Sequence, residues 1–96
     1  MTLPADAPQS LSIEKVVPNP VKENAVIKVF ADENMQVAIR LYDVAGKKLF
    51  YAEKYLTKGI NELPLYTDRF QNGMYLLEIS RLSGSDRAVE KIIIRK

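Results

Sequence analysis

The stretch from Met35 to Phe50 constrains the fold most, because its pattern is that of two strands joined by a tight turn. A lone hairpin is only marginally stable in water, so this one requires a second apolar sheet over its inner face. Side chains along a strand alternate between two faces, and here the two faces are Val37, Ile39 and Leu41 against Ala38, Arg40 and Tyr42.

The turn of this hairpin spans residues 43–46. Glycine adopts a positive φ without a Cβ clash, and aspartate accepts hydrogen bonds from the backbone N–H groups that follow it. We therefore expect Asp43 and Gly46 to act through the backbone conformation of the turn. The second strand of the hairpin then continues over residues 49–56.

Further segments with a strand pattern follow one another at a spacing of about 8–13 residues. Together with the hairpin they make seven strands, which predicts an all-β chain folded as a β-sandwich. Pro64 lies between inward-facing leucines and predicts an edge position for its strand. The additional strands are expected at residues 11–17, 25–30, 60–66, 74–82 and 87–95.

The first of these strands is interrupted by proline. Its apolar residues predict that Ile13 and Val17 face inward, with Lys15 as an exception on that face. The Pro-Asn-Pro sequence at residues 18–20 ends the strand, because proline lacks an N–H and restricts the residue before it. Residues 21–24 are then expected to form a turn.

The connection before the sixth strand carries several local signals. Thr67 is predicted to cap one short helical turn, with Phe70 dipping into the core. Asn72 and Gly73 reverse the chain, and we expect a positive φ at this glycine. Tyr75 follows early in a long strand, as in the tyrosine corner of sandwich folds, whose hydroxyl bonds to nearby backbone.

The residue inventory excludes several classes of chemistry. The chain contains no histidine and no cysteine, which excludes disulfides, thiolate metal sites and the catalytic arrangements that need either residue. Asp32, Glu33 and Asn34 lack the glycine and distal glutamate of a calcium loop, so a hairpin tip is favoured there over a metal site. We expect a protein that is not an enzyme and has no cofactor. A net charge of +2 with interspersed charges argues against a nucleic-acid-binding surface.

The beginning of the chain has a different composition. Residues 1–10 contain two prolines and small or polar residues, which predicts a flexible linker before a domain at residues 11–96. This segment lacks the basic start and apolar core of a signal peptide. No apolar run approaches the ~20 residues of a membrane-spanning helix, so no transmembrane segment is expected.

The order of signals along residues 17–96 resembles the type A C-terminal sorting domain carried by cargo of the type IX (Por) secretion system in Gram-negative bacteria. The resemblance covers nearly all of the chain after the linker. Phe70 is a departure, because the family more often has leucine there, and it enlarges a core contact. The matching positions are Pro18, Asn19 and Pro20 early in the chain, Asp43 and Gly46 in the hairpin turn, Gly73 and Tyr75 before the long strand, and Lys91 to Lys96 at the basic and apolar end.

The resemblance implies an immunoglobulin-like β-sandwich that serves as an export signal. It further implies passage through the periplasm to the cell surface or the medium. The outer-membrane translocon would recognise the domain, and a sortase-like protease would remove it from its cargo. Most of the matching residues also have an adequate folding role, so the match alone does not say which of them a partner contacts.

The last strand departs from the usual alternation of a half-exposed strand. Ile92 and Ile94 can serve the core, which places Ile93 on the opposite face between two basic residues. A neighbouring loop covering Ile93 is one explanation. The other is an apolar patch with a charged rim that binds the translocon, formed by Lys91, Ile93, Arg95 and Lys96.

Two other functions stay open from the sequence. The first is a binding module for a glycan or protein, attached to a surface enzyme. Such modules display exposed aromatic residues, and the candidates here are Tyr42, Tyr51, Tyr55 and Tyr66, with Phe30 if it faces outward. The second is a weak dimer formed through an edge strand.

Overall fold

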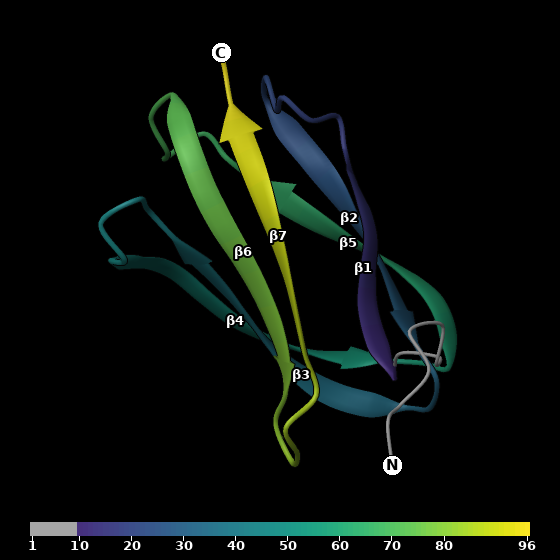
Figure 1. The fold of residues 1–96 in the computed structure, drawn as a ribbon. Coiled ribbons are helices and arrows are strands. Elements are labelled where there is room, and N and C mark those ends of the chain that lie inside the picture. Colours follow the sequence, from purple (N-terminus) through teal and green to yellow (C-terminus); the bar gives the residue numbers. More distant parts are fainter. Residues whose placement is uncertain (1–9) are drawn as a thin grey trace, which may run out of the picture.

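The computed structural model describes residues 10–96 as a sandwich of seven strands (Figure 1). The predicted all-β, immunoglobulin-like architecture is confirmed, and no helix occurs in this range. Of the predicted linker, residues 1–9 lie outside the described part of the chain. The strands are β1 (Leu11–Val17), β2 (Asn24–Ala31), β3 (Met35–Tyr42), β4 (Lys48–Leu56), β5 (Gly59–Tyr66), β6 (Gly73–Arg81) and β7 (Arg87–Ile94).

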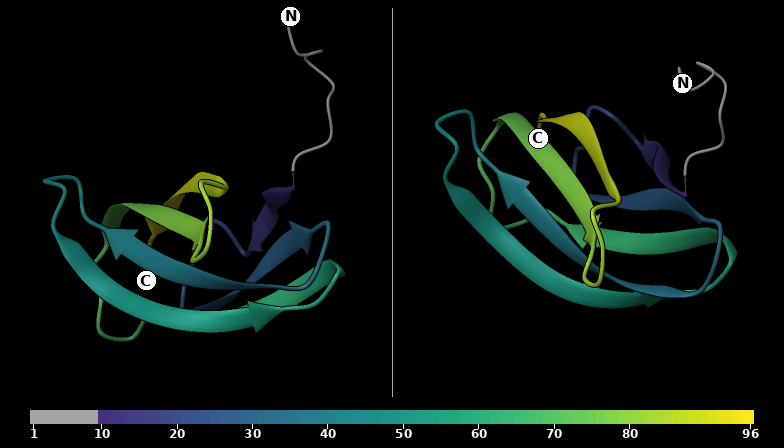
Figure 2. Two further views of the ribbon diagram at one scale, coloured as in Figure 1. Left: turned by 90° about the horizontal axis from the view of Figure 1, so that it is seen from below. Right: turned by 60° about the horizontal axis from the view of Figure 1, so that its bottom comes forward.

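The strands form two antiparallel sheets, one in the order β1-β2-β5 and one in the order β4-β3-β6-β7. The chain passes from one sheet to the other after β2, β4 and β5, so the segments at residues 32–34, 57–58 and 67–72 connect the layers. In both views of Figure 2 the chain turns back between β4 and β5 at one end of the sandwich. Within the described residues, no helix is long and apolar enough to cross a membrane.

The core fills the space between the two sheets. It consists of every second residue of the strands, the residues that face the other sheet, as the period-2 pattern predicts. Complete burial of one such side chain contributes about 1.5–3 kcal/mol. The largest fully buried side chains are Ile27, Val29, Val37, Leu41, Leu56, Leu65, Leu77, Ile79, Ile92, Ile94, Val21 and Thr67.

The inward face of β1 was predicted wrongly beyond Ile13, which itself packs half-buried against the core as expected. The ladder between β1 and β2 skips a position between Ile13 and Lys15, so the strand contains a bulge that exchanges its two faces. As a result Val16 is 6% exposed and Val17 is 43% exposed, the reverse of the expectation. Because of the same bulge, Lys15 lies exposed on the outer face and not on the inward face where it was expected.

Two predictions about connections were also wrong. Val21 was expected in an exposed turn, but it is fully buried and forms a parallel bridge to Ile94. Thr67 caps no helix: its buried hydroxyl donates to the carbonyl oxygen of Glu23. Phe70 closes a single hydrogen-bonded turn on Thr67 and packs, half-buried, against the core.

The turn of the central hairpin has the predicted backbone chemistry. The Asp43 carboxylate accepts hydrogen bonds of 2.9 Å from the N–H groups of Ala45 and Lys47. Gly46 has a φ of 85°, a conformation that side chains with a Cβ rarely adopt. Gly59, at the connection between β4 and β5, has a φ of 109°.

Candidate partner-binding site

The predicted binding residues lie at the end of β7. Ile92 and Ile94 are buried against the core, and Lys91 and Ile93 therefore face the outside of the four-stranded sheet. Ile93 is half-buried, and Arg95, just beyond the strand, is exposed. The structure thus brings Lys91 and Ile93 together on one face.

Lys96 lies apart from this face. Its N–H donates to the side-chain oxygen of Asn72 at 2.8 Å, and its ammonium donates to the carbonyl oxygen of Asp68 at 3.2 Å. Both contacts are in the connection between β5 and β6. Asn72, expected only to reverse the chain with Gly73, thus also binds the end of the chain.

The Pro-Asn-Pro segment runs along the open edge of β7. The Val21 N–H donates to the Ile93 carbonyl oxygen at 2.7 Å, and the Arg95 N–H donates to the Val21 carbonyl oxygen at 2.8 Å. The Asn19 side chain continues this ladder, accepting from the Ile93 N–H at 3.1 Å and donating to the Lys91 carbonyl oxygen at 3.4 Å. Residues 19–21 therefore occupy the outward backbone groups of the second half of β7, and we call them the latch.

The outer face of β6 adds an apolar surface beside Lys91 and Ile93. In the β6–β7 register, Met74 lies opposite Ile93 and Leu76 lies opposite Lys91. Met74 is 46% and Leu76 39% exposed. These four residues form what we call the terminal patch. A signal for it existed in the sequence, since both β6 residues alternate with buried Tyr75.

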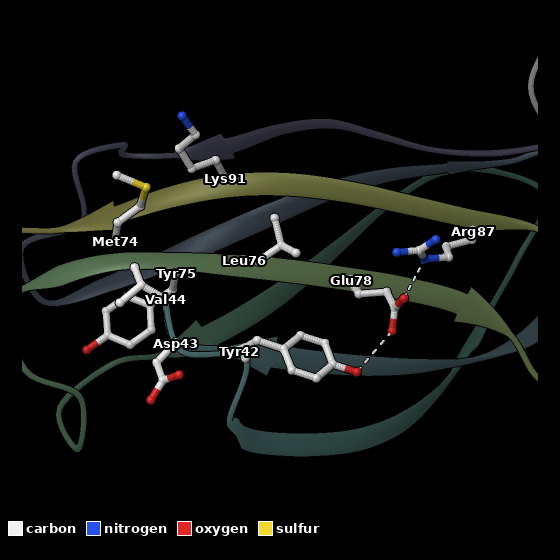
Figure 3. A pocket seen from close by; sticks show the side chains of 10 residues that line it. Tyr42, Asp43, Val44, Met74, Tyr75, Leu76, Glu78, Arg87 and Lys91 are labelled. Carbon is white, nitrogen blue, oxygen red and sulfur yellow. Dashed lines mark hydrogen bonds and ion pairs between the residues drawn. The ribbon is translucent and has the colours of Figure 1, made fainter.

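A shallow groove follows the terminal patch toward the β3–β4 turn (Figure 3). Its floor is apolar, and charged groups stand at its sides. Tyr42 donates to Glu78 at 3.4 Å, and Arg87 forms an ion pair with the same carboxylate. Within residues 10–96, Lys91 forms no ion pair. The groove can therefore offer an apolar contact and one free cation to a partner.

The family-motif residues have structural positions. Tyr75 forms the predicted tyrosine corner: it is 7% exposed, and its hydroxyl donates to the Gln71 carbonyl oxygen at 2.5 Å. Gly73 begins β6 with the expected positive φ, 157°, a conformation that side chains with a Cβ rarely adopt. Asn19 lies in the latch between Pro18 and Pro20, and the peptide bonds before both prolines are cis.

The tyrosines proposed for a glycan-binding face do not form one platform. Tyr51 and Tyr55 lie on the outer face of the four-stranded sheet, opposite the outward residues of β3. Tyr66 lies on the outer face of the other sheet, where it pairs with exposed Asn24. Phe30 also faces outward on that sheet, but it is half-buried.

The acidic segment at residues 32–34 is part of the connection between the sheets. Glu33 pairs with Arg81 at 2.9 Å, and the Asn34 side chain accepts from the Lys58 N–H at 2.9 Å. The hydrogen bonds that Arg81 donates to the Glu33 and Asp86 carboxylates raise the pKa of its guanidinium. Among residues 10–96, no group of three or more acidic side chains is arranged to hold a metal ion.

Comparison with known proteins gives one family and two similar folds. The family model described as the secretion system C-terminal sorting domain matches residues 15–95. Dimeric latent PorU from Porphyromonas gingivalis has a similar fold, with a TM-score of 0.74 and 20% identity over 96% of this chain and 10% of PorU. Beta-glucosidase from Kluyveromyces marxianus follows, with a TM-score of 0.57 and 14% identity over 91% of this chain and 14% of the enzyme. No curated protein matches the chain.

Proposed function

This chain belongs to the family of secretion system C-terminal sorting domains and is a sorting signal of type IX secretion, and we propose that the machinery recognises its terminal patch. The match over residues 15–95 carries the functional conclusion. A sorting domain of this kind directs export to the cell surface or the medium, and its family is not one of enzymes.

The proposed route has three steps. The cargo crosses the periplasm, and the outer-membrane translocon binds the sorting domain. A sortase-like protease then cuts within residues 1–10, which the sequence predicts to be accessible. N-terminal sequencing of the released domain is expected to give a start in that segment. A start inside β2 would contradict the proposed cleavage position, because the strand is paired on both sides.

The terminal patch has the composition of a binding surface. Apolar residues at the centre of an interface contribute desolvated contact, while charged groups at the rim improve encounter and specificity. Ile93, Met74 and Leu76 supply the apolar part. Lys91 and Arg95 supply positive charge at its border, both exposed.

Lys96 contributes in a different way in this proposal. Its two hydrogen bonds to the β5–β6 connection hold the end of the chain against the sandwich. Replacement by glutamate keeps the N–H bond to Asn72 but removes the ammonium. The charge at the end of the chain then falls by two.

The test is a fusion of the 96-residue chain to a passive reporter in a host with the translocon. Ile93→Thr combined with Lys96→Glu should retain the reporter in the periplasm while changing the melting temperature by only a few degrees. The matched control is Ile60→Thr with Lys15→Glu, which makes the same two changes on the outer face of the other sheet, where Ile60 is 58% exposed.

The two variants have distinct outcomes. Retention of the reporter with the first pair and normal export with the control would support recognition at the terminal patch. Normal export with both pairs would show that the patch is not the address. Retention of the unsubstituted fusion in the periplasm would overturn the sorting function itself.

A further inference from the structure

The four sheet edges differ in how they are protected from another strand. The latch covers the second half of β7, and β1 carries a bulge and lies beside β7. Pro64 interrupts the edge formed by β5. Prolines, bulges, covering segments and charged side chains are the usual devices that block edge-to-edge pairing. The edge formed by β4 has no proline, bulge or covering segment between Phe50 and Leu56, and its charged residues there are Glu53 and Lys54.

Strand β4 also exposes unusual side chains for an unprotected edge. Phe50 is 36%, Tyr51 43% and Tyr55 60% exposed. Within the described residues, β4 pairs with β3 alone. Every second residue of such a strand directs its N–H and C=O groups away from the sheet, as a template for another strand.

We propose that this edge binds a second copy of the chain, with the two β4 strands antiparallel and Ala52 on the two-fold axis. The pairing would join two four-stranded sheets into one continuous sheet of eight strands. This inference does not depend on the export function. It follows from the sequence of β4, because the other registers place unfavourable pairs opposite each other.

The register argument begins with geometry. The backbone N–H and C=O groups of β4 point outward at every second residue. Two antiparallel copies must therefore place residues of the same backbone direction opposite each other. This requires the two-fold axis to pass through one residue position and not between two residues. Glu53 on the axis would face the partner's Glu53, and Lys54 would likewise face its own copy. Tyr51 on the axis would place Lys48 opposite the partner's Lys54. Like charges directly opposite each other destabilise a strand pair.

An axis at Phe50 fails for a different reason. The ladder between β3 and β4 shifts where Leu41 pairs with Phe50 and Tyr42 pairs with Lys48. Pairing centred on Phe50 would therefore use the irregular part of the strand. An axis at Tyr55 would pair only residues 54–56 of the two strands, because β4 ends at Leu56. Ala52 is then the remaining choice within the regular part.

With Ala52 on the axis, the opposed side chains are complementary. Tyr51 faces the partner's Glu53, and Phe50 faces the partner's Lys54. Arg40 lies 5.1 Å and Lys48 5.2 Å from the centre of the Tyr51 ring. The partner's Glu53 would thus approach a tyrosine that has two cations beside it. Glu53 can accept a hydrogen bond from this phenol, as it does from Tyr51 within one chain at 2.7 Å.

The experiment is sedimentation velocity on the 96-residue chain over the micromolar to millimolar range. We expect a monomer–dimer equilibrium, weak because the interface is a single strand pair. Tyr51→Glu places glutamate opposite glutamate twice and should weaken association about tenfold. Tyr51→Glu with Glu53→Lys pairs opposite charges and should restore it.

A matched control and a cross-link complete the test. Tyr66→Glu, on the outer face of the other sheet, should leave association unchanged. The chain has no cysteine, so Ala52→Cys introduces one thiol, which should form a disulfide across the axis. Lys54→Cys should not, because its copies lie four residues out of register, beyond disulfide reach. A monomer at all concentrations, an unaffected Tyr51→Glu dimer, or equal cross-linking at both positions would overturn the proposal.

Discussion

The side chain of Asn19 holds the backbone of Ile93 as a neighbouring strand would. Its oxygen accepts from the Ile93 N–H at 3.1 Å, and its nitrogen donates to the carbonyl oxygen of Lys91 at 3.4 Å. In a parallel ladder these two bonds come from the C=O and N–H groups of one residue of the adjacent chain. The carboxamide takes that place beside Pro20, whose nitrogen carries no hydrogen.

Asn19→Ala should destabilise the domain by about 1 kcal/mol, because two hydrogen bonds to the β7 backbone are lost. Urea unfolding measures the loss, and amide exchange should show faster exchange at the Ile93 N–H. Lys22→Ala, a neighbouring exposed change, is the control and should alter neither. Unchanged protection of Ile93 in Asn19→Ala would show that the side chain is not needed for this ladder.

Tyr75→Phe should also destabilise by about 1 kcal/mol, since the buried hydroxyl donates to the Gln71 carbonyl oxygen. Tyr66→Phe removes a hydroxyl from a side chain that is 67% exposed and should have almost no effect. Thermal unfolding of the two variants side by side checks the difference. Equal melting temperatures would contradict a stabilising tyrosine corner.

Gly46→Ala should destabilise by about 1 kcal/mol or more, because of its φ of 85°. Contacts do not explain this cost, since nothing lies within 4 Å of the position that a Cβ would take. Gly46→Asn should cost less, because asparagine tolerates positive φ better. Gly73→Ala, at a φ of 157°, should also destabilise the domain. An unchanged urea midpoint in either alanine variant would refute the assignment.

Tyr51 should ionise above its ordinary pKa of about 10. The hydrogen bond to Glu53 is the main cause of the raised pKa, followed by partial desolvation. This bond needs the protonated phenol, so its contribution is present below pH 10 and is lost as the pH rises through the folded-state pKa. The pKa of Tyr51 is measured by alkaline titration followed by tyrosinate absorbance, as the difference between the unsubstituted domain and Tyr51→Phe. Glu53→Gln should lower the pKa, and an unchanged value would exclude the carboxylate as its cause.

The local sequence predicted the strands well, because alternation and turn chemistry are local properties. All seven strands occur, the Asp43 turn has its expected bonds, and Pro64 marks an edge strand. The errors arose where a distant segment decides the outcome. Val21 is buried by Ile94, and the Thr67 hydroxyl bonds to Glu23, neither of which a local pattern contains. The bulge in β1 was missed because strict alternation assumes a regular ladder.

The candidate site was only partly visible in the sequence. Ile93 stood out because it breaks the alternation of β7. Its neighbours Met74 and Leu76 required the β6–β7 register, which places them opposite Ile93 and Lys91. The position of Lys96 could not be foreseen, because its bonds go to the connection before β6, whose path depends on packing.

The latch joins parts of the chain that are more than 70 positions apart, as the Asn19 bonds to residues 91 and 93 show. Contacts of such long range form late, since the chain must first close a large loop. Until residues 91–95 are available, the slot between β6 and the latch stays empty and Val21 has no partner. Closure of the sandwich therefore requires synthesis of the whole domain, because a polypeptide interrupted upstream of β7 cannot form the latch contacts.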